Sequence, residues 1–241
     1  MTLGHRINAC SRGLLATAAL LFASAGLLFA SAGTAAAGVG LFGEYGRGMS
    51  ASGGDVGGTL ATLGLANSFL DRNEFSVGIA TDSNLARDSL INFRFDFGFH
   101  TSLFANPTMK TLSGNGYGGV LDFALGFGIL RSESMRLWIA PDARVNVDYY
   151  GSHLLSPFTG DALDVAVGVG PKIGLNLHAG DRTTITLSTA YNYKWGWLVF
   201  PNATGAGSLS RRDHYVGVNL AFFWRGGDDR YDRLGLDQYG K

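Results

Sequence analysis

His100 and Ser102 stand two residues apart, and they form the pair in this sequence that most resembles catalytic machinery. A histidine can activate a serine hydroxyl as a nucleophile when a carboxylate orients the imidazole ring. The sequence fixes no such carboxylate, and two residues at this spacing often occur together by chance. We therefore interpret His100 as a polar residue without a catalytic role.

Other residues that carry catalysis or metal binding are sparse. The single cysteine, Cys10, lies in a segment that we expect to be removed, so the mature chain has no thiol nucleophile and no cysteine metal site. No glycine-rich phosphate loop and no H-E-x-x-H motif occurs. The 19 basic and 19 acidic residues give zero net charge and no basic surface for nucleic acid. We expect no enzyme activity, catalytic residue, metal or cofactor.

Charged and apolar side chains alternate along residues 90–104. The odd positions from Ile91 to Phe99 are apolar, and the even positions include Arg94 and Asp96. Successive side chains of a β-strand point to opposite faces, so this period of two predicts a strand with one apolar and one polar face. A helix, with its period of 3.6, would scatter the apolar residues around its axis.

The same alternation recurs along the chain. We expect strands at 39–49, 75–82, 90–104, 118–130, 136–150, 163–178, 183–199 and 215–224. Apolar faces opposite small or charged ones are typical of a barrel that meets lipid outside and is polar inside. The sequence therefore predicts an all-β fold, an eight-stranded antiparallel transmembrane β-barrel.

The inward faces of these strands carry most of the charge. An eight-stranded barrel is narrow enough for side chains to fill it. An unpaired buried charge is costly, so we expect the inward charges to pair and close the lumen. Inward glycines leave some room, and a polar path for small solutes is the alternative. Asp82 also faces inward, and the predicted lumen charge network comprises Glu44, Arg94, Asp96, Asp122, Asp142, Arg144, Asp148, Asp164, Lys172 and Lys194.

Aromatic side chains gather near both ends of the outward faces, as expected of residues at the two membrane interfaces. Those expected toward the external side are Tyr149, Tyr191, Tyr193, Trp195 and Trp197. Those expected toward the periplasmic side are Phe127, Phe222 and Trp224.

The strand number follows from the connections. Bacterial single-chain barrels have an even number of strands, with short periplasmic turns and longer external connections. We place the longer connections, 50–73, 105–115, 151–160 and 200–213, on the external side, which gives eight strands. Ten strands are the alternative, because segment 59–70 is apolar enough for a strand or a short helix. Pro141 and Pro171 lie inside strands, where each removes a ladder donor, and we expect β-bulges there.

The chain divides into three parts. Residues 1–37 resemble a cleavable signal peptide, because basic residues precede an apolar run that ends near Ala35-Ala36-Ala37. An uncleaved membrane helix is the alternative for this segment. The barrel occupies 38–225, and 226–241 form a polar tail.

The last strand carries a motif. Tyr215-x-Gly217-x-x-Leu220-x-Phe222 resembles the C-terminal targeting signal that the outer-membrane barrel assembly machinery reads. The alternation over 38–225 resembles the small eight-stranded OmpA/OmpX-type barrels of Gram-negative bacteria. In that family the final aromatic residue usually ends the chain, whereas 17 residues follow Trp224 here. That tail is too short for the peptidoglycan-binding domain of some relatives.

The resemblance implies residence in the cell outer membrane. The implied partners are the lipid bilayer, lipopolysaccharide and, during insertion, the assembly machinery. Members of the family serve as adhesins, structural plugs, small pores and lipid enzymes, so the fold does not decide the task. We expect a non-enzymatic structural or surface-interaction role through the external connections. A narrow passive channel and an outer-leaflet lipid-modifying enzyme that uses His100 and Ser102 are the alternatives.

Overall fold

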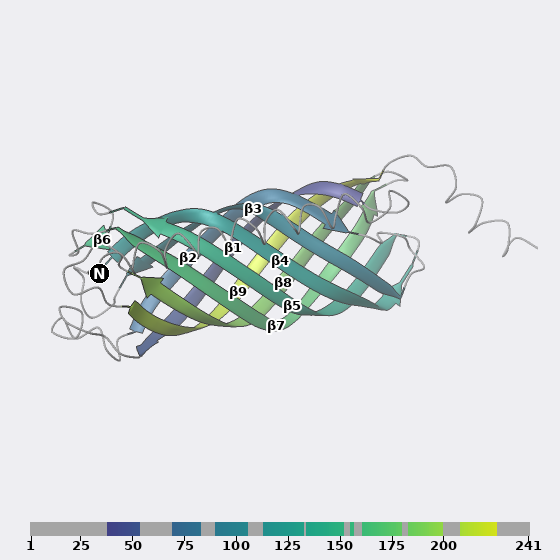
Figure 1. Ribbon diagram of the computed structural model, residues 1–241. Coiled ribbons are helices and arrows are strands. Elements are labelled where there is room, and N and C mark those ends of the chain that lie inside the picture. The colour runs from purple at the N-terminus through teal and green to yellow at the C-terminus, as the bar shows by residue number, and fades with distance from the viewer. Residues whose placement is uncertain are drawn as a thin grey trace, which may run out of the picture.

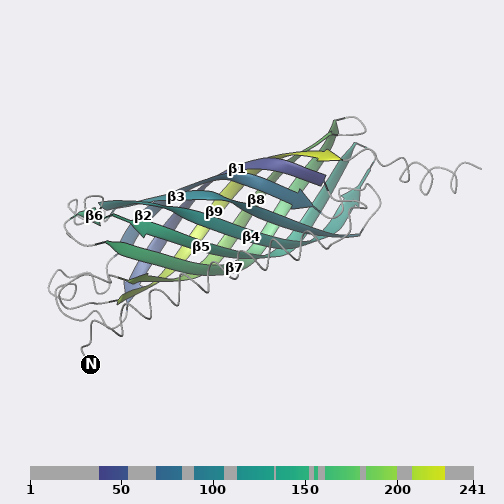
Figure 2. The same cartoon turned by 45° about the horizontal axis from the view of Figure 1, so that its top comes forward.

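The computed structural model describes residues 38–53, 69–82, 90–105, 113–132, 134–151, 155–156, 161–179, 183–199 and 208–225. Its strands are β1 (Gly38–Gly53), β2 (Phe69–Asp82), β3 (Ile91–Ala105), β4 (Ser113–Arg131), β5 (Met135–Tyr150), β6 (Leu155–Ser156), β7 (Ala162–Ala179), β8 (Thr183–Val199) and β9 (Ser208–Arg225). Figure 1 shows the long strands running obliquely around one elongated barrel, and Figure 2 shows the same wall from a second direction. No helix in these ranges is long and apolar enough to cross a bilayer.

Eight long strands close the barrel. Each pairs antiparallel with the next long strand in sequence, and β9 returns to pair with β1. β6 is a two-residue addition that pairs with the start of β4. A closed sheet has no unpaired edge, which is the condition for a sheet that spans a membrane. The predicted eight-stranded antiparallel barrel is confirmed, and the described residues contain no further strand pair that would make ten.

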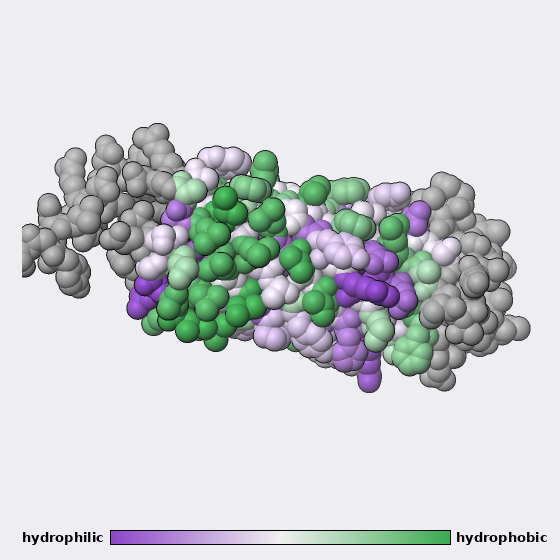
Figure 3. Space-filling model, turned by 180° about the vertical axis from the view of Figure 1, so that it is seen from behind, coloured by the Kyte–Doolittle hydropathy of each residue, from purple (hydrophilic) through white to green (hydrophobic). Residues whose placement is uncertain are grey.

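The alternation of side chains gives the barrel a polar interior and an apolar outer wall. In β3, Phe93, Phe97 and Phe99 are 46–53% exposed, whereas Arg94 and Asp96 are at most 1% exposed. The even positions of the strands up to β8 face inward, and in β9 the odd positions do so. Figure 3 shows hydrophobic side chains over much of one outer face. An apolar wall around a charged interior is the arrangement of a transmembrane barrel.

Three strands begin at least five residues earlier than the sequence predicted. β2 begins at Phe69 rather than at residue 75, β4 at Ser113 rather than at residue 118, and β9 at Ser208 rather than at residue 215. The predicted connections 50–73, 105–115 and 200–213 were therefore too long. In the stretches DRNE (71–74) and RRDH (211–214), polar residues occupy both faces of the strand, so no apolar face revealed the period of two.

Pro141 on β5 and Pro171 on β7 are direct partners, without a register shift between these strands. The expected β-bulges at the prolines were wrong. Pairing lapses instead at each proline and at one neighbour, at Ala140 and Pro141 toward β4 and at Gly170 and Pro171 toward β8. Facing residues of an antiparallel ladder alternate between hydrogen-bonded and non-bonded pairs. The prolines occupy a non-bonded pair, so their missing donors face β4 and β8. The shift that does occur lies between Gly128 and Leu130.

Several predictions fall outside the described residues. These are the signal peptide at 1–37, the tail at 226–241 and residues 59–68 of the apolar segment 59–70. The last two residues of that segment, Phe69 and Leu70, belong to β2.

Candidate functional site

The barrel interior holds a dense network of ionisable side chains. Each predicted lumen charge is at most 8% exposed: Glu44, Arg94, Asp96, Asp122, Asp142, Arg144, Asp148, Asp164, Lys172 and Lys194. The strand period places them there, because all of them occupy inward positions. Charges removed from water need partners, so the contacts of these groups define the site.

Sequence reasoning missed further buried charges. These are Arg72, Glu74, Arg136, Arg211 and Asp213. Four of them lie in the two stretches that were predicted as connections, and Arg136 lies on the inward face of a predicted strand. Continuing the inward period of β2 and β9 toward their external ends would have found those four. Asp82, which was predicted to face inward, is also fully buried.

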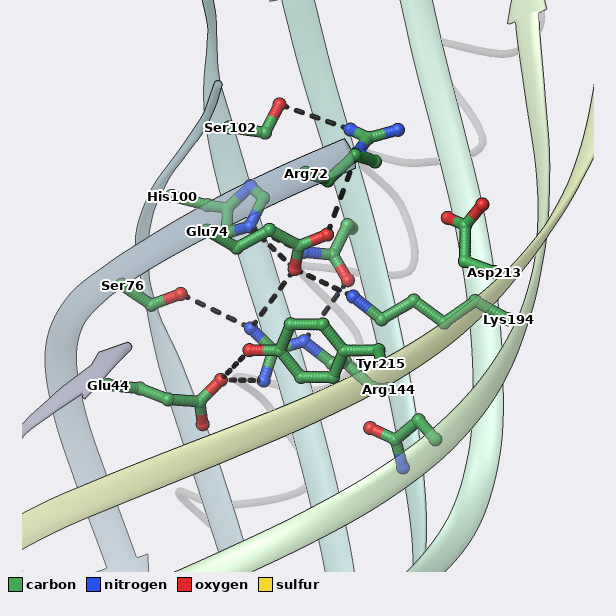
Figure 4. Close-up of polar contacts among 12 residues, drawn as sticks. Glu44, Arg72, Glu74, Ser76, His100, Ser102, Arg144, Lys194, Asp213 and Tyr215 are labelled. Carbon is green, nitrogen blue, oxygen red and sulfur yellow. Dashed lines mark hydrogen bonds and ion pairs between the residues drawn. The ribbon is translucent and has the colours of Figure 1, made fainter. Parts of the chain in front are cut away.

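Glu74 on β2 is a junction of this network, as Figure 4 shows. Its Oε2 lies 2.6 Å from Nζ of Lys194 and 3.3 Å from Nε2 of His100. The same oxygen lies 4.0 Å from Nη2 of Arg144, and Oε1 lies 3.8 Å from Nε of Arg72. One carboxylate therefore connects basic groups from β2, β3, β5 and β8.

Two ion pairs span the full width of the barrel. Nη1 of Arg144 on β5 contacts Oε1 of Glu44 on β1. Nη1 of Arg72 on β2 lies 2.9 Å from Oδ2 of Asp164 on β7. In the closed order of eight strands, β5 is fourth from β1 and β7 is fourth from β2, so each pair joins opposite walls. These side chains cross the lumen at their two levels.

Tyr215 on β9 packs against the same groups. Its hydroxyl donates to Oε1 of Glu44 at 2.6 Å. Nζ of Lys194 lies 3.5 Å from the centre of its ring, and the guanidinium carbon of Arg144 lies 4.9 Å from it. A cation over an aromatic face is attracted by the ring quadrupole. The first residue of the predicted targeting motif is therefore a buried member of the charge network.

The other residues of that motif lie on both faces of β9. Gly217 faces inward and is buried. Leu220 and Phe222 face outward, at 43% and 42% exposed. The two hydrophobic residues spaced by one therefore form part of the lipid-facing wall.

A carboxylate–lysine–carboxylate group lies beside Arg144. Nζ of Lys172 lies 2.5 Å from Oδ1 of Asp122 and 3.2 Å from Oδ1 of Asp142. The amide of Asn192 donates to Asp142 at 2.8 Å. Asp122 also lies 3.5 Å from Arg144, which joins this group to the pair that crosses the barrel.

Arg94 and Asp96 form the next group toward the end where Gly38 and Arg225 lie. Nε of Arg94 donates to Asp96 at 3.0 Å, and Nη2 donates to it at 3.1 Å. The guanidinium carbon lies 5.2 Å from the centre of the Phe223 ring. An apolar cluster of Phe42, Ala80, Val120, Ala221 and Phe223 completes the packing on this side.

The extensions of β2 and β9 supply the group near the external end. Asp164 is held by Arg72 and by Arg211, whose Nη2 lies 2.7 Å from Oδ2. Arg211 also forms an ion pair with Asp213, two residues along the same strand face. Hydrogen bonds to charged groups are stronger than neutral ones. Paired side chains from β2, β7 and β9 therefore project into the lumen toward the end opposite Gly38 and Arg225.

His100 and Ser102 are hydrogen-bonded to other residues and not to each other. Nδ1 of His100 lies 2.7 Å from Oδ1 of Asp148, so a carboxylate does orient the ring. The other nitrogen, however, faces Glu74, and it lies 2.9 Å from the amide of Asn146. The Ser102 hydroxyl contacts the Tyr150 hydroxyl and accepts from Arg72 at 3.2 Å. Figure 4 shows it beside the guanidinium group.

No group of His, Cys, Asp or Glu within the described ranges is placed to hold a metal ion. The acidic side chains of the interior meet Arg, Lys, His, Asn and Tyr instead. The arrangement is suited to holding the wall in a fixed shape.

The predicted interface aromatics all lie on the outer wall. Tyr193 is half-exposed, and the others are 38–53% exposed: Phe127, Tyr149, Tyr191, Trp195, Trp197, Phe222 and Trp224. Trp224 on β9 pairs with Val39, near the start of β1. Trp197 on β8 pairs with Val165, near the start of β7, and β7 begins at the opposite end of the barrel. The two groups therefore lie toward opposite ends of the barrel, as residues of two membrane interfaces would.

Comparisons with known proteins give structural likenesses only. No family model matches the sequence, and no curated protein matches it by sequence. Neisserial surface protein A aligns at 10% identity and a TM-score of 0.36, over 77% of this chain and 99% of that one. OprG from Pseudomonas aeruginosa aligns at 11% and 0.41 (80% and 97% covered), and the outer membrane protease OmpT from Escherichia coli at 9% and 0.40 (79% and 96%). Likenesses this distant say nothing about what this chain binds or does.

The chain's own construction places it among outer-membrane barrels. It combines a closed antiparallel sheet, an apolar outer wall with aromatic residues toward both ends, and an interior of paired charges. That combination is the architecture of proteins that cross the bacterial outer membrane as strands.

Proposed function

We propose that this protein is a non-enzymatic outer-membrane barrel, closed to solutes, that rigidly supports its external connections for surface interaction. The observation that carries the proposal is the pair of ion bridges between opposite walls, Arg144 to Glu44 and Arg72 to Asp164. Bridges of this kind occupy the centre of the lumen and resist changes in its cross-section. The lack of a contact between His100 and Ser102 supports the non-enzymatic part.

Conductance in planar bilayers tests the closed lumen. The protein is refolded in detergent, and a heat-modifiable gel shift confirms that it is folded before it is added to the bilayer. We expect no stepwise single-channel events from folded, inserted protein. Reproducible steps from the same material would overturn the closed barrel in favour of a passive channel. A soluble monomer without detergent would overturn the membrane barrel itself.

The surface-interaction role is tested by shortening one connection. Residues 52–68 are replaced by Asn-Gly, so that the paired residues Ala51 and Phe69 flank a two-residue hairpin turn. We expect the variant to keep its gel shift, while cells that express it adhere to surfaces less than cells with the wild-type protein. Equal adhesion after the same replacement of each external connection would remove this role.

A further inference from the structure

Charges on the outer wall are confined to one place. The outward positions of β3, β5, β7 and β8 carry no charged residue among the described side chains. Arg47 on β1, Asp71 on β2 and Arg212 on β9 face outward, and these three strands are neighbours. Arg131, at the opposite end of β4, pairs with the inward-facing Arg136 beyond the register shift, so it lies at the mouth of the lumen and not on the outer wall. We call Arg47, Asp71, Arg212 and His214 the outer patch.

The strand register brings the outer patch together around Met49. The direct partners of Met49 are Asp71 on β2 and His214 on β9. Arg47 is the preceding outward residue of β1, and Arg212 is the partner of the following one, Ala51. The two arginines are therefore about 13 Å apart along the strands, from a rise of about 3.3 Å per residue. On the outer face that Figure 3 shows, hydrophobic side chains dominate the left half and hydrophilic side chains gather in the right half.

Among the described side chains on this face, one carboxylate, that of Asp71, opposes the two arginines. Nη2 of Arg47 lies 3.6 Å from Oδ2 of Asp71, and their side chains are 65% and 40% exposed. An exposed pair of this kind is weak and can be rearranged by another anion. The outer patch therefore carries an excess of positive charge from its two arginines.

Aromatic side chains border the outer patch. Trp195 is the direct partner of Arg212, and Tyr193 is the direct partner of His214. The Tyr193 ring lies 5.2 Å from the His214 ring and 4.9 Å from the Trp195 ring, and the Tyr191 hydroxyl lies 2.7 Å from Nδ1 of His214. Flat aromatic faces next to cations suit a ligand that has sugar rings as well as anionic groups.

The level of the outer patch points to the outer leaflet. Gly38 and Arg225 are partners at one end of the barrel, the end that is periplasmic in bacterial barrels. A tilted strand needs about 9–11 residues to cross the hydrocarbon, and Arg47 is the tenth residue of β1. An arginine is tolerated on a lipid-facing wall near the interface, whereas at the midplane it is strongly destabilising.

From this placement we propose that the outer patch binds the phosphorylated sugar headgroup of an outer-leaflet saccharolipid, of the lipopolysaccharide class. The inference rests on the proposed outer-membrane location. Arg47 and Arg212 bind phosphates on separate sugars, because Arg forms strong hydrogen bonds to phosphate. Trp195 and Tyr193 pack against the sugar rings, and the acyl chains lie along the apolar wall below.

Lipid A titration of the refolded protein in detergent tests this proposal, with tryptophan fluorescence as the signal. The double variant Arg47→Gln with Arg212→Gln is compared with wild type and with Arg131→Gln, a matched loss of an exposed arginine at the far end. We expect about twenty-five-fold weaker binding by the double variant, from about fivefold per arginine. Arg131→Gln should bind like wild type. Lipid A freed of its phosphates should bind wild type as weakly as intact lipid A binds the double variant.

Three results would overturn the proposal. These are unchanged affinity in the double variant, unchanged affinity for phosphate-free lipid A, and phosphatidylglycerol that binds as tightly as lipid A. If the double variant gives no gel shift, Arg212→Gln alone carries the comparison. The gel shift of wild type and Arg131→Gln separates the two proposals. If the barrels fold but lipid A binding does not depend on the arginines, only the proposed lipid site is wrong. If the wild-type protein never folds in detergent, the proposed membrane barrel is wrong.

Discussion

The ammonium group of Lys194 on β8 lies 2.6 Å from the carboxylate of Glu74 on β2, although two strands, β9 and β1, separate them around the wall. Both side chains are at most 2% exposed. The contact therefore bridges the lumen, and it ties the strand extension that begins at Phe69 to the far side of the barrel.

Glu74→Ala should destabilise the barrel strongly. The change leaves Lys194 buried without its nearest carboxylate, and it also removes a partner of His100 and Arg72. Breaking a buried pair by removing one partner costs about 3–5 kcal/mol. Urea unfolding in detergent, followed by the heat-modifiable band, measures the loss.

Asp71→Asn is the matched control for that experiment. It removes the partner of Arg47 in a pair whose side chains are 65% and 40% exposed, so the loss should be at most about 1 kcal/mol. Equal losses in the two variants would contradict the view that the interior pair holds the barrel together.

Gly98→Ala should impair folding because the neighbouring backbone leaves no room for a methyl group. A Cβ atom on Gly98 would lie 2.2 Å from the carbonyl oxygen of Val77 and 2.9 Å from Cα of Gly78. Moving a paired strand to relieve such a contact costs about 1–3 kcal/mol. A lower urea midpoint and a smaller fraction of heat-modifiable protein are the expected results.

Gly43→Ala provides the contrast. Nothing lies within 4 Å of a Cβ atom at Gly43. The substitution should change the free energy of unfolding by no more than about 0.5 kcal/mol apart from the stiffening of the unfolded chain. If Gly98→Ala were as well tolerated as this variant, the close approach of β2 and β3 would not constrain the sequence.

The sequence was sufficient to predict the fold and most of the residues that face the lumen. A shift of one residue turns every side chain of a strand to the other face, so Phe93 outward and Arg94 inward are strongly specified together. The prediction failed where both faces of a strand are polar. At Arg72 and Glu74, and again at Arg211 and Asp213, there was no apolar face to reveal the strand, and these residues were assigned to connections.

The individual ion pairs could not be predicted. Arg144 meets Glu44 because β5 and β1 lie on opposite walls and because the stagger of the strands brings the two residues to one level. The spacing of residues along the chain shows neither which strands lie on opposite walls nor how the strands are staggered. The partnership of Pro141 with Pro171 has the same origin, since it depends on the register between two strands and not on either strand alone.

Tyr215→Phe should insert normally but be less stable. The variant keeps an aromatic ring at the first position of the predicted targeting motif and loses the hydroxyl that donates to Glu44 at 2.6 Å. A hydrogen bond to a charged group contributes about 1.5–3 kcal/mol. We expect the rate of assembly in cells to match wild type, and the urea midpoint to fall.

Phe222→Ala should have the opposite effect to Tyr215→Phe, with slower assembly and a smaller loss of stability. Phe222 faces outward at 42% exposed and lies outside the charge network, so its loss should slow assembly more than it lowers the urea midpoint. Pulse-labelling with the gel shift measures assembly. Slow assembly of Tyr215→Phe together with an unchanged midpoint would show that the hydroxyl serves targeting rather than the interior.

His100→Ala should lower the stability of the barrel more than Ser102→Ala, and neither variant should change the lipid A of the cells. Removing the imidazole takes away the contacts with Asp148 and Glu74 and leaves two buried carboxylates with fewer partners, at a cost of about 3–5 kcal/mol. Removing the Ser102 hydroxyl leaves Tyr150 in contact with Arg72 at 3.1 Å and should cost about 1 kcal/mol.

Because the serine faces Tyr150 and Arg72 rather than the imidazole, neither variant should change the mass spectrum of lipid A from cells that express it. A new lipid A species that requires the wild-type protein and disappears in both variants would instead establish the pair as catalytic, since loss of stability alone would spare the Ser102→Ala protein.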